Sequence, residues 1–128
     1  MAYLKPPAFV SKVFNPLAIR TGIGGSKALV VTRRRSGGLQ RIPVIPIEHA
    51  GSRYVVSTRG ESEWVRNLRA AGRVELGGTA FTVTELALDE RAPVIDAYRA
   101  KAGRSVETYF KQLPDPADHP VFRLEQPA

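Results

Sequence analysis

Hydrophobic and β-branched residues in the first half of the chain recur in short runs that are typical of β-strands. These runs occupy residues 27–34, 39–49 and 53–58, and turns rich in glycine, serine and alanine separate them. The second run contains Pro43 and Pro46, neither of which has a backbone N–H to donate to a neighbouring strand. We therefore expect this strand to lie at an edge of the sheet or to contain a bulge.

The pattern changes to a helical period over residues 61–72. Apolar side chains recur there at spacings of four and three, on a face that carries Trp64, Leu68 and Ala71. A second face, which we expect to lie in solvent, carries Arg66, Arg69 and Arg73. Thr58 and Glu61 have the spacing of a capping box, so Thr58 is expected to cap the helix while Glu61 reaches back. Asn67 lies beside the apolar face, where a polar amide needs a hydrogen-bonding partner.

The second half of the chain predicts a hairpin, two helices and a last strand. The expected elements are strands 73–76, 79–86 and 121–125 and helices 88–102 and 105–113. The hairpin turns at Gly77-Gly78, and Ser105 is expected to cap the last helix. Strands that meander around an inserted helix indicate an α+β fold built on a small antiparallel barrel.

We expect a single domain, residues 1–128, because the chain is too short to form two hydrophobic cores. Residues 1–26 are expected to form an N-terminal helix and turn segment, with a short amphipathic helix over 10–20, and residues 27–128 the barrel with its helices. No apolar run approaches the roughly 20 residues that span a bilayer. Prolines near the N-terminus argue against a cleaved signal peptide, and we expect a cytoplasmic location.

The basic charge is concentrated in one part of the sequence. The chain carries a net charge of +7, and fourteen of its nineteen basic residues are arginine. Residues 1–73 hold 13 Lys and Arg against three Glu, whereas residues 74–128 hold six against nine acids. The first half would therefore attract an anionic partner. The chain has no cysteine, which excludes disulfides, thiol catalysis and thiolate metal sites.

Two places in the sequence combine residues suited to bind an anionic or planar ligand. In the first hairpin, Arg33-Arg34-Arg35 stands beside Ser36-Gly37-Gly38, and Arg41 follows across the turn. Arginine side chains and curled backbone amides together could hold a phosphate or carboxylate; the alternative is a solvated hairpin tip. At the start of the helix, Arg59 and Gly60 occupy a strand-to-helix corner whose free amides could bind the carbonyl oxygens of a flat ligand.

Several of these segments resemble one family of enzymes. The segments are TRRRSG, RIPVIPIEHAGSRYVVSTRGES and EWVRNLRAAGRVEL, together with the final HPVFRLE. Their order resembles that of the deazaflavin-dependent nitroreductases, which are split β-barrel oxidoreductases that use coenzyme F420. The resemblance implies an FMN-binding split-barrel-like fold and hydride transfer from the reduced deazaflavin to a small organic acceptor, such as a nitroaromatic, an enone or a quinone.

The resemblance also implies which residues form the site. The phosphate and oligoglutamate tail of F420 would be held by Arg34, Arg35, Ser36, Gly37 and Arg41. The deazaflavin ring would lie along Ser57, Thr58, Arg59 and Gly60, with Trp64 and Asn67 completing the site. Tyr109 is our choice for a catalytic residue of the substrate pocket. No metal is expected, and His49 and His119 are interpreted as structural.

Three other interpretations of the sequence remain open, and so does the question of whether the chain forms a homodimer. FMN, whose single phosphate needs fewer arginines, could occupy the same barrel. A basic domain could instead bind nucleic acid, which would make its affinity strongly dependent on salt. The N-terminal segment around Phe9–Leu17 could contact a membrane peripherally, alongside catalysis. Split barrels commonly pair, so a homodimer is possible.

Overall fold

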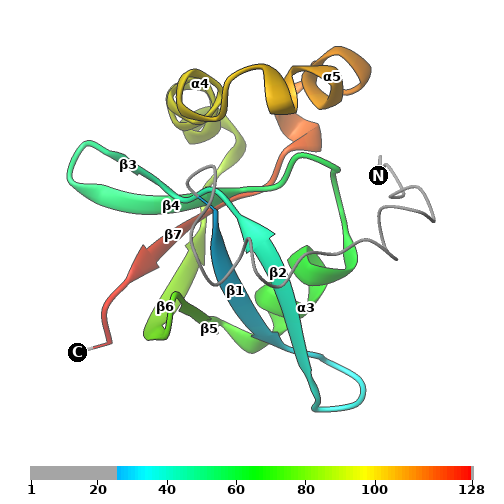
Figure 1. Ribbon diagram of the computed structural model, residues 1–128, viewed down its shortest axis with the longest axis vertical. Helices are drawn as coiled ribbons and strands as arrows, with labels where there is room; N and C mark the ends of the chain where they lie inside the picture. Colours follow the sequence, from blue (N-terminus) through cyan, green and yellow to red (C-terminus); the bar gives the residue numbers. More distant parts are fainter. Residues whose placement is uncertain (1–25, 128) are drawn as a thin grey trace.

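The computed structural model describes residues 26–127, so the expected helix over 10–20 and the segment around Phe9–Leu17 lie outside the described residues. Seven strands form one antiparallel sheet that curls into a split half-barrel, with helices around it (Figure 1). The strands are β1 (Lys27–Thr32), β2 (Leu39–Val44), β3 (Ile47–His49), β4 (Ser52–Val56), β5 (Arg73–Leu76), β6 (Thr79–Glu85) and β7 (Val121–Glu125). The helices are α3 (Glu63–Ala71), α4 (Arg91–Ala102) and α5 (Arg104–Gln112), and short 3₁₀ turns cover η2 (Leu88–Glu90) and η3 (Pro116–Asp118).

The strand order β2-β1-β5-β6-β7-β4-β3 places the proline-bearing segment at both edges of the sheet. The single strand expected over 39–49 is in fact two strands, because the pairing breaks at Ile45 and Pro46. Before the break β2 pairs with β1, and after it β3 pairs with β4 at the opposite edge. This confirms the prediction of an edge position and shows where the barrel is split.

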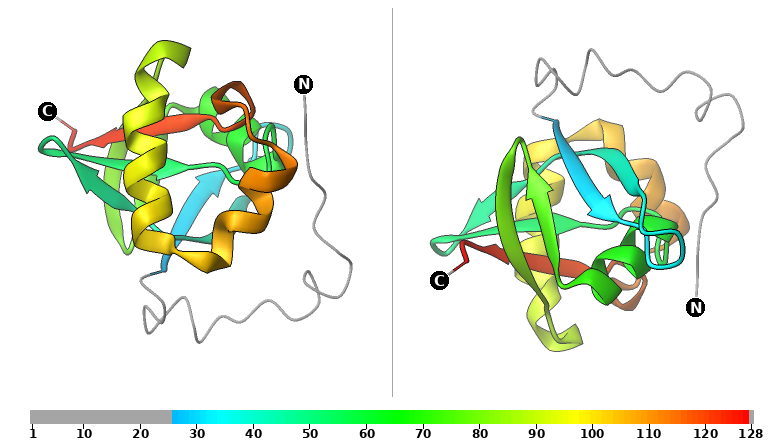
Figure 2. Two further views of the ribbon diagram at one scale, coloured as in Figure 1. Left: turned by 90° about the horizontal axis from the view of Figure 1, so that it is seen from above. Right: turned by 90° about the horizontal axis from the view of Figure 1, so that it is seen from below.

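The buried side chains of this one sheet form two clusters, on opposite faces of β4, where the sequence led us to expect one core. One fills the curl of the sheet beneath α3 and includes Leu29, Leu68 and Phe122. The other lies between β4, β7 and the pair of helices α4 and α5, which cover the outer face of these strands (Figure 2). Because β4 packs on both faces, Tyr54, Val55 and Val56 are all buried, so this strand is a continuous apolar run without alternation.

The start of α3 differs from the expected capping box. The N-cap residue is Ser62 rather than Thr58. The carboxylate of Glu61 does not reach back to the backbone but accepts two hydrogen bonds from Arg69, at 2.7 and 3.1 Å. Arg69 also donates to Glu85 at 2.7 and 2.9 Å, so this residue of the expected solvent face is exposed but forms ion pairs with two carboxylates. A nearly buried carboxylate is better stabilised by a two-pronged guanidinium than by a single amide.

The expected cap of the last helix was also wrong. Gly103 ends α4 and precedes α5 directly, with φ of +69°. The Ser105 hydroxyl lies inside α5 and donates to the carbonyl oxygen of Ala102 at 2.9 Å. None of the helices in the described region is long and apolar enough to cross a membrane.

Candidate functional site

The first hairpin is attached to helix α3 through Asn67. The Asn67 side-chain oxygen accepts hydrogen bonds from the backbone N–H of Arg34 at 3.1 Å and from its Nη1 at 2.8 Å. The Asn67 amide nitrogen donates to Gln40 on β2 at 2.8 Å. Asn67 is 0% exposed, so the partner that a buried amide needs is provided by both sides of the hairpin. Arg34 also forms an ion pair with Glu63 at 3.1 Å.

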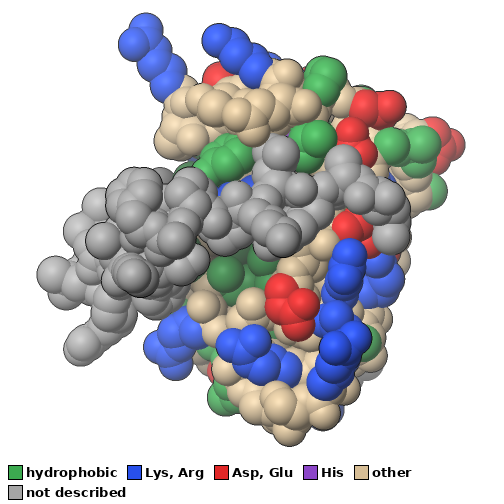
Figure 3. Space-filling model, turned by 90° about the vertical axis from the view of Figure 1, so that its right-hand side faces the viewer, with side chains coloured by type: hydrophobic (Ala, Val, Ile, Leu, Met, Phe, Trp, Pro, Cys, Tyr) green, Lys and Arg blue, Asp and Glu red, His purple; other side chains and the backbone are tan. Residues whose placement is uncertain are grey.

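The remaining arginines of the hairpin are exposed. Within the described chain, the side chains of Arg33, Arg35 and Arg41 make no hydrogen bond or ion pair. The turn itself is closed by Arg33 N–H donating to the Gly38 carbonyl at 2.7 Å, and Gly37 adopts a φ of +75°. On the face shown in Figure 3, Lys and Arg side chains gather over the lower end of the molecule, around acidic side chains and below visible hydrophobic ones.

From the sequence, Arg41 on the return strand could meet Arg34 or Arg35 across the hairpin, but the register does not bring it opposite Arg34. The register pairs Arg41 with Val30, four residues before Arg34, and pairs its neighbour Gln40 with Val31. Successive strand residues point to opposite faces, so Arg41 lies on the face away from Gln40 and Asn67. Arg34, by contrast, is turned toward α3. The sequence could not reveal this because the register of the pairing was unknown.

The connection between β4 and α3, residues 57–62, is called the junction here. Ser57 is 0% exposed, and its hydroxyl donates to the Gly60 carbonyl at 2.7 Å. The same carbonyl accepts from Ser62 N–H at 2.9 Å. Gly60 has a φ of +77°, which strains any residue with a side chain. Ser57 therefore shapes the junction from beneath rather than facing a ligand.

Arg59 and Tyr109 connect the junction to helix α5. The Arg59 guanidinium donates to the Tyr109 hydroxyl at 3.0 Å and lies 5.2 Å from the centre of the tyrosine ring. Both residues are half-buried. The structure thus brings the two predicted site residues together, although they are fifty positions apart in sequence.

A cavity of about 230 Å³ lies beside the junction and is called the junction pocket. Its lining includes Val44, Ile45, Val56, Thr58, Trp64 and Tyr98. Tyr98 was not selected from the sequence, because helical spacing alone did not show that it faces this pocket. Burial, followed by the nearby Tyr109, raises the pKa of Tyr98 to about 12, so its hydroxyl keeps its proton at neutral pH.

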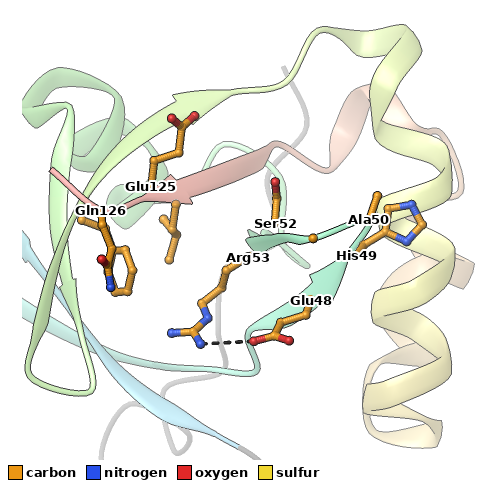
Figure 4. Close-up of a pocket in the computed structure, with 10 residues that line it drawn as sticks. Glu48, His49, Ala50, Ser52, Arg53, Glu125 and Gln126 are labelled. Atoms are coloured by element: carbon orange, nitrogen blue, oxygen red, sulfur yellow. Dashed lines mark hydrogen bonds and ion pairs between the residues drawn. The ribbon is translucent and has the colours of Figure 1, made fainter. Parts of the chain in front are cut away.

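A larger cavity of about 680 Å³ lies at the turn between β3 and β4 (Figure 4). In it Arg53 lies over the ring of Phe81 at 5.7 Å and pairs with Glu48 at 3.2 Å. None of the predicted site residues lines this cavity. We therefore place the candidate site at the junction pocket, which the predicted residues Thr58 and Trp64 line, and not at the larger cavity.

The two histidines do not belong to any cluster of potential metal ligands in the described part of the chain. Among residues 26–127, no group of three or more potential metal-ligating side chains comes together. His119 is fully buried between two backbone carbonyl oxygens, and His49 ends β3.

Comparison of the sequence with known protein families identifies the family of this chain. The sequence model of the F420H(2)-dependent quinone reductases matches residues 18–112. The chain belongs to this family. Membership confirms the predicted reductase class and its predicted cofactor, coenzyme F420. A search of curated proteins found no match.

Solved structures share the fold of this reductase at low sequence identity. Protein Atu2129 from Agrobacterium tumefaciens, of unknown function, is 16% identical with a TM-score of 0.61; the match covers 97% of this chain but only 60% of that one. An F420-H2 dependent reductase (FDR-A) is 23% identical with a TM-score of 0.54, covering 77% and 91% of the two chains. A protein described as a domain-swapped dimer is 20% identical with a TM-score of 0.51, covering 77% and 78%. These similarities confirm the split-barrel fold.

Proposed function

We propose that this protein transfers a hydride from reduced F420 to a small organic acceptor of the quinone, enone or nitroaromatic type. The main support for the proposal is the attachment of Arg34 to α3. This attachment holds the hairpin, with its exposed arginines, against the helix that follows the junction. A cofactor with a long anionic tail and a flat head requires such a pair of neighbouring sites.

The hairpin would hold the tail. Arg34 and Arg35 present guanidinium groups, and Ser36 and Gly37 form the turn between them and β2. Because the Arg34 side chain is only 23% exposed and is held by Asn67, little of its freedom remains to be lost on binding. Arg41 would contribute from the outer face of β2 to the distal, flexible part of the tail.

The junction would hold the head. Thr58, Arg59, Gly60 and Trp64 provide its surface, while Ser57 and Asn67 support that surface from within. The Ser62 hydroxyl is buried without a hydrogen-bonding partner among residues 26–127, which fits a polar ligand at the start of α3. The junction pocket, at about 230 Å³, is smaller than the roughly 300–1,000 Å³ of typical ligand sites, so part of the ring system would lie outside it.

Bound F420 supplies the hydride, and the residues of the chain position the reactants and exclude water. Transfer requires the donor and acceptor atoms to lie roughly 3–3.5 Å apart. Tyr109 would contact the acceptor, with its hydroxyl oriented by the hydrogen bond from Arg59. Tyr98 lines the junction pocket, and its hydroxyl, which keeps its proton, would donate a hydrogen bond to an acceptor oxygen placed within reach.

The deciding experiment is a titration of the purified protein with F420, and separately with FMN. The oxidation of reduced F420 is then followed with quinones, enones and nitroaromatics. We expect tight F420 binding and turnover with at least one acceptor class. Tight binding of FMN without binding of F420 would refute the proposal.

The tail site is tested by combining Arg34→Ala with Arg35→Ala. Hydrogen bonds to charged groups contribute about 1.5–3 kcal/mol each before screening, so affinity for F420 should fall about tenfold or more. Arg53→Ala is the matched control, because Arg53 is a half-exposed arginine in an ion pair outside the candidate site. Equal affinity of the double variant and the wild type would contradict the tail site.

We also propose that two copies of the chain associate, since a structural neighbour forms a dimer. Light scattering on the purified protein measures this, and a mass of one chain at all concentrations would contradict it.

A further inference from the structure

His119 is a buried ionisable residue for which the proposed reaction has no use. Its side chain is 0% exposed and lies between η3 and β7. The Nδ1 atom is 2.8 Å from the Ser57 carbonyl oxygen, and the Nε2 atom is 2.6 Å from the Leu113 carbonyl oxygen. The ring therefore connects the junction to the end of helix α5.

Both partners of the ring are carbonyl oxygens, which accept hydrogen bonds and cannot donate them. A neutral imidazole carries one N–H, so its second nitrogen would direct a lone pair at an oxygen at hydrogen-bonding distance. Only a ring with a proton on each nitrogen donates to both Ser57 and Leu113. Both separations are short, as expected when the donor is charged.

The surroundings of His119 suit a positive charge. Leu113 is the C-cap of α5, where the final carbonyl oxygens lack partners within the helix and carry partial negative charge. The Phe110 ring lies 4.3 Å from the imidazole, centre to centre, and an aromatic face attracts a cation. The guanidinium of Arg99 also lies over this ring, 4.8 Å from its centre, so the two cations would share it. No carboxylate in the described residues forms an ion pair with the ring. The charge is thus compensated by dipoles and an aromatic face.

We propose that His119 is a doubly protonated positioning residue that fixes the junction and places a buried positive charge beneath it. Ser57 is held at both backbone groups, since its carbonyl accepts from His119 and its N–H donates to Pro120 at 2.9 Å. The Ser57 hydroxyl in turn fixes the Gly60 carbonyl. Two hydrogen bonds therefore connect the imidazolium to the corner of the junction. The identity of the ligand that benefits, F420, rests on the proposed function.

The protonation state is measured directly by nitrogen NMR of the imidazole rings in the labelled wild-type protein at neutral pH. His49 is the only other histidine and serves as an internal reference. We expect both nitrogens of His119 to carry protons. A spectrum with one unprotonated nitrogen in His119 would overturn the proposal. This measurement needs no variant and no cofactor.

The positioning role is measured with His119→Gln, whose neutral side chain satisfies one carbonyl oxygen only, and with His49→Gln as the matched control. We expect F420 to bind His119→Gln about tenfold more weakly, because one charge and one contact are lost, and to bind the control as it binds the wild type. Unchanged affinity in a folded His119→Gln protein would overturn the role. If the wild type itself binds no F420, the proposed function fails, while the NMR result still decides the protonation of His119.

Discussion

Asn67→Ala tests most directly how the first hairpin is held on α3. The substitution removes three hydrogen bonds of a fully buried amide, two to Arg34 and one to Gln40. Each partner left without a bond costs about 1–3 kcal/mol when it is buried. Arg34 keeps its ion pair with Glu63, which offsets part of the loss. We therefore expect the free energy of unfolding to fall by about 2–4 kcal/mol, a large part of the roughly 5–15 kcal/mol of a typical domain.

Urea unfolding of three variants separates the contributions. Gln40→Ala removes one of the three bonds and should cost only about 0.5–1.5 kcal/mol. Asn67→Asp keeps the acceptor that faces Arg34 but loses the donor to Gln40, and it should lie between the other two. Because the hairpin carries the proposed tail site, Asn67→Ala should also weaken F420 binding in the protein that remains folded. If Asn67→Ala proved no more destabilising than Gln40→Ala, the amide would not hold the hairpin.

Three further outcomes follow from the site. The hydrogen bonds from Arg69 lower the pKa of Glu61, so the stability that Glu61 contributes is present above its pKa in the unfolded chain and is lost as pH falls through its pKa in the folded protein. Glu61→Gln should therefore weaken the acid dependence of the free energy of unfolding in urea titrations, and an unchanged dependence would be contrary evidence. Gly60→Ala and Gly51→Ala, at φ of +77° and +83°, should each lower the free energy of unfolding by about 1 kcal/mol, yet only Gly60→Ala should weaken F420 binding. Equal F420 affinities of the two variants would show that the junction does not bind the cofactor. Burial raises the pKa of Tyr98 to about 12, so the stability that Tyr98 contributes is intact below its pKa of about 10 in the unfolded chain and is lost as pH rises toward 12. Tyr98→Phe should remove this loss of stability at alkaline pH. The same variant should slow turnover, and normal turnover would exclude a catalytic role.

Much of the local structure could be predicted from the sequence. Strand runs, glycine turns and the helical period of residues 61–72 depend on neighbouring residues, so their positions were found to within a few residues. The prediction that the proline-bearing segment lies at an edge also held, because a missing backbone N–H has the same consequence in any sheet. The break between β2 and β3 was missed, since the sequence does not show which strand each half pairs with.

The details of the site depended on long-range contacts. Thr58 and Glu61 had the spacing of a capping box, but Glu61 pairs with Arg69 and Ser62 caps the helix. The spacing was a valid local signal, yet a guanidinium brought close by the fold is a stronger partner for a carboxylate. For a related reason the sequence did not show that Arg41 lies opposite Val30 and not Arg34, because a strand register is fixed by the whole sheet.

By itself, the sequence determined which segments become strands and helices, where the positive charge gathers and which family the chain resembles, because these follow from residue type and spacing. Only the tertiary structure decided that Asn67 holds Arg34 on α3, that Tyr98 lines the junction pocket and that His119 lies between two carbonyl oxygens. Each of these contacts joins residues that are distant in sequence, and their partners are fixed only when the sheet curls and the helices pack against it.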